Sequence, residues 1–179
     1  MLIIPGFLVA AVTFPGVIVH EFAHQLFCRI FRVPVYDVVY FQMKNPCGYV
    51  SHEPVDRPLA SFMISVGPFL VNTVLGMLIV FPAAIELFQF RVYHNVMSLL
   101  LGWLGISILM HAFPSIGDAK VMVQSILKNP DVNLFAKVIT APVIGLVYLG
   151  AVGSMMWLDF LYAVAMAMAL PNLIVMMMK

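Results

Sequence analysis

The chain contains five apolar stretches that are each about long enough to cross a lipid bilayer, and this feature limits the folds open to it. A hydrocarbon core of about 30 Å takes roughly 20 apolar residues in helical form. The stretches lie from Leu2 to Cys28, between Arg57 and Glu86, between Arg91 and Asp118, between Lys137 and Asp159, and from Phe160 to Met178. Inside lipid, helices satisfy every backbone polar group within one segment. We therefore expect an all-α polytopic membrane protein with about five transmembrane helices.

Composition supports this class. Hydrophobic residues make up 63% of the chain and charged residues 9%, with a mean hydropathy of +1.05. A water-soluble domain needs more charge to cover its surface. The net charge of +1 comes without a basic patch, so we expect the lipid bilayer and not nucleic acid as a partner. We expect one membrane-embedded domain over residues 1–179, with a core at 1–130 and a C-terminal helical hairpin at 131–179, and no removable signal peptide.

The distribution of Lys and Arg orients the predicted spans. With five spans, the loop 29–57, the loop 114–137 and the C-terminus share one side, and they hold eight of the nine Lys and Arg residues. Only Arg91 falls on the other side. By the positive-inside rule, the N-terminus is outside and the C-terminus cytoplasmic. We expect a multi-pass protein of a prokaryotic cell membrane, with Cys28 and Cys47 as free thiols.

Two loops have structure of their own. Residues 35–41 (V-Y-D-V-V-Y-F) are β-branched and aromatic, Asn45-Pro46-Cys47-Gly48 is typical of a turn, and residues 49–52 (Y-V-S-H) can return as a strand. These residues predict a small membrane-associated β-hairpin after the first helix. Residues 115–128 predict a short amphipathic helix at the interface.

The sequence H-E-F-A-H lies in the first apolar stretch, at His20, Glu21 and His24. Residues four apart share one face of a helix, so both imidazoles can reach a single cation. The glutamate beside them can act as general base on a metal-bound water. Ionisable residues are costly in a membrane and mark function. The pattern favours a zinc site, and the alternatives are interhelical hydrogen bonds with a protonated Glu21, or a haem held by a histidine.

Catalytic zinc has three protein ligands and leaves a fourth position to water. Asp118 follows Pro114 and Gly117, which can end the third span and turn the chain back towards the metal. Asp118 can equally cap the helix that follows it. His111 and Cys28 are the competing third ligands. His52 and His94 occupy loop positions, where we expect them to be solvated.

These residues resemble the site-2-type intramembrane zinc metalloproteases, in three elements in the family's order. H-E-F-A-H is the first. Residues 65–72 (S-V-G-P-F-L-V-N) are similar to the family's G-P-x-x-N element, and residues 113–119 (F-P-S-I-G-D-A) to the segment that ends in L-D-G and supplies the third zinc ligand. The β-hairpin is similar to the family's membrane-associated strands.

The resemblance implies one Zn²⁺ bound by His20, His24 and Asp118, with Glu21 as the catalytic base. It implies a protease that cleaves in or near the transmembrane segments of membrane proteins or peptides. Gly67, Pro68 and Asn72 would contact substrate, although the extra residue in G-P-x-x-x-N turns Asn72 by about 100°, and an interhelical hydrogen bond is the alternative.

An extended substrate can add to the edge of the predicted strand, at Val35, Tyr36, Val38 and Tyr40. The chain is expected to be a minimal member of the family, because no regulatory domain is recognisable in it. The rival classes are a catalytically inactive membrane scaffold and a metal-handling membrane protein that retains the H-E-x-x-H site.

Overall fold

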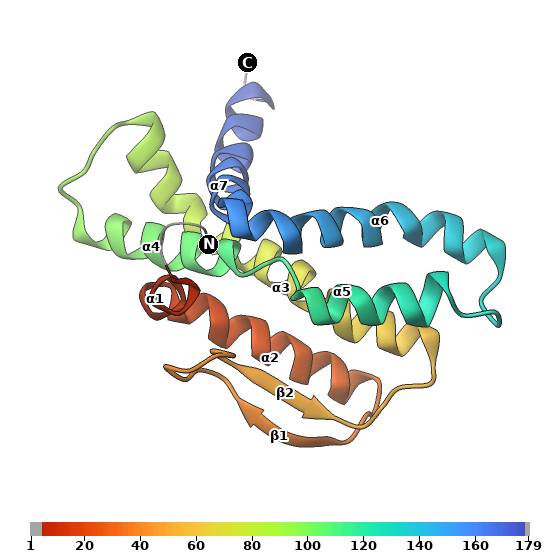
Figure 1. Ribbon diagram of the computed structural model, residues 1–179. Coiled ribbons are helices and arrows are strands. Elements are labelled where there is room, and N and C mark those ends of the chain that lie inside the picture. Colours follow the sequence, from red (N-terminus) through yellow and green to blue (C-terminus); the bar gives the residue numbers. More distant parts are fainter. Residues whose placement is uncertain (1–4, 178–179) are drawn as a thin grey trace.

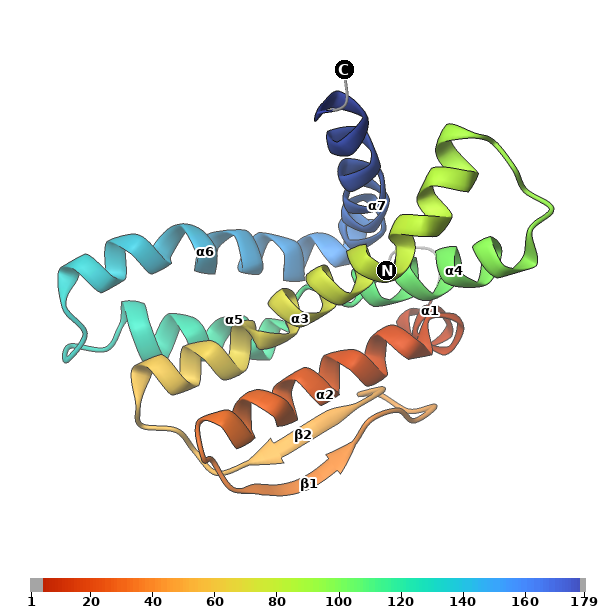
Figure 2. The ribbon, with the colours of Figure 1, turned by 180° about the vertical axis from the view of Figure 1, so that it is seen from behind.

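The computed structural model describes residues 5–177 and consists mainly of helices, with one two-stranded sheet (Figures 1 and 2). Leu2, Met178 and Lys179, which belong to the predicted ends of the chain, lie outside the described residues. The elements are α1 (Gly6–Val12), α2 (Phe14–Ile30), β1 (Val35–Val39), β2 (Tyr49–His52), α3 (Pro58–Ala84), η1 (Ile85–Gln89), α4 (Val96–Met110), α5 (Ile116–Met122), η2 (Val123–Leu127), α6 (Leu134–Gly153), η3 (Ser154–Met156) and α7 (Leu158–Met177).

The prediction of five transmembrane helices is wrong. Among the described residues, two helices are long and apolar enough to cross a membrane, at Pro58–Leu87 and Leu134–Met156. A third span results if α1 and α2 are counted together, although they are bent by 92°. Helix α4 has 15 residues, or about 22 Å at 1.5 Å per residue, which is short of the hydrocarbon core. The predicted sides of the N-terminus and the C-terminus were derived from five spans, so they are no longer supported by that count.

The first predicted span breaks at a proline. Pro15 stands in the first turn of α2, where its missing N–H costs nothing but its ring prevents continuation of α1. The Thr13 hydroxyl closes the end of α1 by donating to the Val9 carbonyl at 2.7 Å. The apolar run therefore contains two helices instead of one straight span.

The β-hairpin and the amphipathic helix are confirmed. Strands β1 and β2 pair antiparallel, with Val38 opposite Val50 and Val39 opposite Tyr49. Both strands contact α2, and β2 lies nearer to α2 in both views (Figures 1 and 2). Helix α5 and the π-helical turn η2 occupy the segment for which the short helix was predicted.

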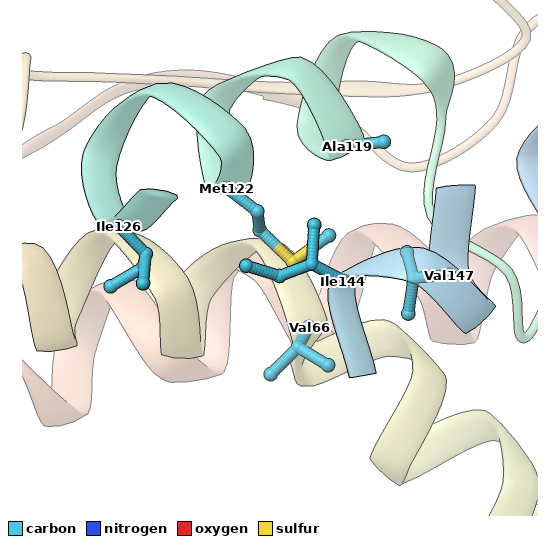
Figure 3. Packing of buried hydrophobic residues seen from close by; sticks show 6 residues of the cluster. All are labelled: Val66, Ala119, Met122, Ile126, Ile144 and Val147. Carbon is cyan, nitrogen blue, oxygen red and sulfur yellow. The ribbon is translucent and has the colours of Figure 1, made fainter. Parts of the chain in front are cut away.

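Helix α5 is held against α3 and α6 by a cluster of buried apolar side chains (Figure 3). Val66 of α3, Ile144 and Val147 of α6, and Met122 of α5 are each at most 3% exposed. Ala119, directly after Asp118, is part of the same cluster. This packing fixes the position of the first turn of α5, where Asp118 lies.

Helices α6 and α7 meet at a corner and then diverge (Figures 1 and 2). Helix α6 packs on α5 and η2, whereas α7 packs on α3 and α4. The corner residue Trp157 has a left-handed backbone with a φ of 65°. The corner brings the first turn of α7 towards the side of the molecule where α2 and α5 face each other.

Candidate metal centre

His20 and His24 lie one above the other on α2, as the four-residue spacing predicts. Their ring centroids are 4.9 Å apart and the rings meet edge to face. Each ring makes a hydrogen bond to a backbone carbonyl on a neighbouring helix. The Nδ1 of His20 donates to the His111 carbonyl at 2.7 Å, and the Nδ1 of His24 donates to the Ile64 carbonyl at 3.0 Å.

These two hydrogen bonds determine which ring nitrogen can bind a metal. A carbonyl oxygen only accepts, so Nδ1 carries the proton in both rings. In a neutral ring, the lone pair is then on Nε2. A metal-binding histidine characteristically donates its other nitrogen to a carbonyl or carboxylate in this way. Both histidines therefore present Nε2 as a metal ligand atom.

Asp118 takes part in capping α5 and also lies beside His24. As the third residue of α5 it forms a capping box, in which its Oδ2 accepts from the Ser115 N–H at 3.0 Å and from the Ser115 hydroxyl at 2.6 Å. Ser115, and not Asp118, is the N-cap residue. The same Oδ2 lies 3.7 Å from Nε2 of His24. The capping box thus orients the carboxylate that faces the histidines.

One ligand atom from each of His20, His24 and Asp118 lies within 4.8 Å of the other two. Ligand atoms in a tetrahedral site with bonds of about 2.0 Å are about 3.3 Å apart. The distance of 3.7 Å between Nε2 of His24 and Oδ2 of Asp118 is close to that separation. Two imidazoles and one carboxylate also suit zinc chemically. The three residues could therefore hold one metal ion.

Glu21 is buried beside this group, with 8% of its surface exposed. The structure contains no hydrogen bond from any of residues 5–177 to its carboxylate, which borders two cavities of about 310 and 260 Å³. Gly48, directly before β2, covers it closely: a Cβ on Gly48 would lie 2.7 Å from Cγ of Glu21. Only glycine permits this approach without a shift.

The β-hairpin supplies further residues to the site, which the sequence did not indicate. His52, expected to be solvated, lines the smaller cavity together with His24 and Asp118. Cys47 lines the larger cavity. Burial raises the pKa of the Cys47 thiol, which disfavours the thiolate that a metal requires. No pattern in the sequence placed the hairpin over α2, because the pairing of sheet and helix is a tertiary contact.

His111 and Cys28, the other candidates for the third metal ligand, do not belong to the group formed by His20, His24 and Asp118. The Nε2 of His111 is 2.8 Å from the Thr13 hydroxyl. Cys28 is fully buried in an apolar cluster with Val33 and Ile64. The backbone carbonyl of His111 nevertheless contributes to the site, because it orients His20.

Asn72 is fully buried between α2, α3 and α4 and lines neither cavity. Its side-chain amide donates to the carbonyls of Gly16, Ile108 and His111 at 3.1–3.2 Å. The His111 carbonyl therefore accepts from both Asn72 and His20. Through this shared acceptor, Asn72 stabilises the carbonyl that orients a candidate metal ligand.

The other predicted substrate contacts lie away from the metal group. Gly67 and Pro68 are buried in α3, and a Cβ on Gly67 would lie 2.3 Å from the Phe27 ring of α2. Val35, Tyr36 and Val38 line a separate groove beside α2. The Tyr40 hydroxyl donates to Gln25 at 2.5 Å.

Comparison of the chain with protein-family models, with curated proteins and with solved structures found no match. The function of the chain is therefore inferred from the chemistry of the site itself.

Proposed function

We propose that this protein is a site-2-type intramembrane zinc metalloprotease, which hydrolyses peptide bonds in or near the transmembrane segments of its substrates. The observation that carries the proposal is the orientation of His20 and His24 by backbone carbonyls, which leaves Nε2 of each ring as the metal-ligand atom in a group whose ligand atoms lie within 4.8 Å of one another. A hydrogen-bonded structural cluster would bring Nε2 of His24 within hydrogen-bond distance of the carboxylate, whereas it lies 3.7 Å from Oδ2 of Asp118.

Each residue then has a chemical role. His20, His24 and Asp118 would hold the metal. When bound, Zn²⁺ would supply the Lewis acidity needed to polarise a peptide carbonyl and to make water more acidic. Glu21 accepts the proton of the attacking water and returns it to the leaving amine nitrogen. Its carboxylate borders both cavities, so it can face a substrate that enters through either.

The substrate must be extended at the cleaved bond, because a helix hides its carbonyls. Strand β1 pairs only with β2 in the described sheet, so an extended segment can add to its outer edge, where Val35, Tyr36 and Val38 line a groove separate from the two cavities at the metal group. We propose that the site faces the cytoplasmic side of the membrane, because Arg29, Arg32 and Arg57 flank the hairpin between α2 and α3 and Lys44 lies in its turn.

The test measures zinc and cleavage on the same preparation. Zinc is quantified in the purified full chain, and cleavage of a panel of transmembrane segments is compared between the parent protein and Glu21→Gln. We expect about one zinc per chain in both, and a loss of cleavage of about 10²- to 10⁴-fold in the variant. Glu53→Gln, which changes an exposed glutamate, is the matched control.

The alternatives give different outcomes. A folded protein that has not been exposed to chelator and holds no zinc would exclude the metal site. Bound zinc without cleavage of any segment would indicate a scaffold or a metal-handling protein. Cleavage that persists in Glu21→Gln would remove Glu21 as the base.

A further inference from the structure

A third cavity continues from the candidate metal centre into the space between α3 and α5. Its volume is about 260 Å³. His52 and Asp118 line both this cavity and the smaller of the two cavities at the metal group. The rest of its lining comes from the chain that follows β2, from α3 and from Val121 of α5, and we call it the α3–α5 pocket. The pocket therefore lies directly beside a candidate metal ligand.

One face of α3 connects the pocket to the metal group. Ser61, Ile64 and Ser65 line the pocket from α3 and are three and four residues apart, so they share one face of that helix. The Ile64 carbonyl accepts the hydrogen bond that orients His24. The same helix face therefore supports a candidate metal ligand and brings two hydroxyl groups to the pocket.

These two hydroxyl groups are buried without a partner in the protein. Ser61 is 5% exposed and Ser65 is 3% exposed, and neither hydroxyl has a hydrogen-bond partner among residues 5–177. Buried serines in a helix commonly donate to the carbonyl four residues earlier, as Ser107 and Ser154 do at 2.6 and 2.8 Å. Within the described residues, the one fully enclosed side-chain oxygen or nitrogen without a partner is Oδ1 of Asn72. The two serine hydroxyls therefore keep access to the pocket, where a ligand can bond to them.

The opposite side of the pocket offers a hydrogen-bond acceptor. The Nδ1 of His52 donates to the Glu53 carbonyl at 2.8 Å, so in a neutral ring the lone pair is on Nε2. Val55 and Val121 add apolar walls, which disfavour a charged group that has no counter-charge. The Asp118 carboxylate is engaged by Ser115 and faces the metal group. The pocket therefore suits a neutral group that both donates and accepts hydrogen bonds.

The pocket leads outward to the surface of the molecule. It shares Val55, Ser61 and Val121 with a further cavity of about 300 Å³, whose lining includes the polar side chains of Gln124 and Asn129. An extended chain can thus run from the metal group through the pocket and out along η2.

We propose that the α3–α5 pocket is a subsite for a glutamine or asparagine side chain of the membrane protein that is cleaved, at a position near the cleaved bond. The inference rests on the proposed function, because the occupant is the proposed substrate. The carboxamide oxygen accepts from the Ser61 and Ser65 hydroxyls, and the carboxamide NH₂ group donates to Nε2 of His52. Because Asp118 lines the pocket and belongs to the metal group, a side chain held there fixes which peptide bond lies beside the metal.

The test measures binding, so that it does not depend on catalysis. Four peptides have a transmembrane part of about 20 leucine and alanine residues, followed by a flexible segment that carries one glutamine, methionine, glutamate or lysine. This residue is placed at successive positions, and the register that binds most tightly is compared. Affinities are measured for the zinc-loaded full chain with Glu21→Gln, in lipid nanodiscs. We expect the glutamine peptide to bind about tenfold more tightly than each of the other three.

Substitutions in α3 locate the preference. Adding Ser61→Ala and Ser65→Ala together should remove the preference for glutamine and retain zinc. Ser107→Ala is the matched control and should keep the preference, because the Ser107 hydroxyl donates within its own helix. Equal binding of the glutamine and methionine peptides would mean that only water occupies the pocket and would overturn the inference. A preference that survives the double substitution, or tighter binding of the lysine or glutamate peptide, would also overturn it.

A second measurement needs no peptide. Hydroxyls without a partner in the protein add nothing to its stability, so the chain with Ser61→Ala and Ser65→Ala should have a thermal unfolding midpoint no lower than that of the parent. A lower midpoint would mean that the hydroxyls bond within the protein, and the inference would fail. Cleavage unaffected by Glu21→Gln would instead remove the proposed base and leave the binding preference as measured.

Discussion

Helix α2 and the α6–α7 corner each bring a buried carboxylate to the same cavity, but they do so by different means. Glu21 is adjacent in sequence to the first of two histidines one helical turn apart, so local helix geometry groups all three residues. Asp159 reaches the cavity only because the chain turns a corner at Trp157 and α7 docks on α3 and α4. Local periodicity thus produces the reactive group, and long-range packing produces the surface around it.

The largest effect should be a difference in zinc content between the variants Asp118→Asn and Asp159→Asn. Asp118→Asn removes one of three charged or basic ligand groups, so we expect the zinc content to fall well below one per chain and cleavage to be lost. Asp159→Asn should retain zinc. The measurement is metal analysis of both purified variants. Equal zinc content in the two would mean that Asp118 is a capping residue only.

A smaller loss of cleavage should follow from a substitution in the hairpin that pushes against the Glu21 side chain. Gly48→Ala places a Cβ within 2.7 Å of Cγ of Glu21 and must displace it. Displacement of a catalytic group by about 1 Å can cost about 10²-fold in rate, with zinc retained. In the control Gly145→Ala, the added Cβ meets nothing within 4 Å. An unchanged cleavage rate in Gly48→Ala would mean that the hairpin does not constrain the base.

The next prediction concerns Asn72, which is buried between α2, α3 and α4. Asn72→Ala removes the amide that donates to three carbonyls, including the one that orients His20. We expect a loss of about 1–3 kcal/mol in the free energy of unfolding, measured by thermal unfolding in detergent, together with weaker zinc binding. Gln124→Ala, at an exposed position, is the control. A lower free energy of unfolding together with an unchanged zinc affinity would mean that Asn72 does not influence the orientation of His20.

The smallest effect should come from the docking of α7. Thr73 of α3 and Tyr162 of α7 are joined by a hydrogen bond of 2.7 Å between their hydroxyls. Thr73→Val keeps the branched shape and removes that bond, at a cost of about 0.5–1.5 kcal/mol in unfolding free energy. Thr140→Val is the matched control, because the Thr140 hydroxyl donates only to carbonyls of its own helix. Equal losses in the two variants would mean that the Thr73–Tyr162 bond does not hold α7.

The sequence predicted the local elements well and the spans poorly. The hairpin and the helix at Ile116–Met122 follow from turn residues and short-range patterns. The span count failed because hydropathy does not register a break such as Pro15, which leaves two helices at 92° to each other within a continuous apolar run. Hydropathy also does not show that α4 ends after 15 residues.

By itself, the sequence determined that the chain is mostly apolar helix and that His20, Glu21 and His24 share one helix, since helical spacing is a property of a single segment. Only the tertiary structure decided that the Ile64 and His111 carbonyls orient the two imidazoles, that Asp118 faces them, and that Gly48 and Asp159 border the same space. These contacts join residues far apart in the chain. They depend on how the helices pack against one another, which no local pattern specifies.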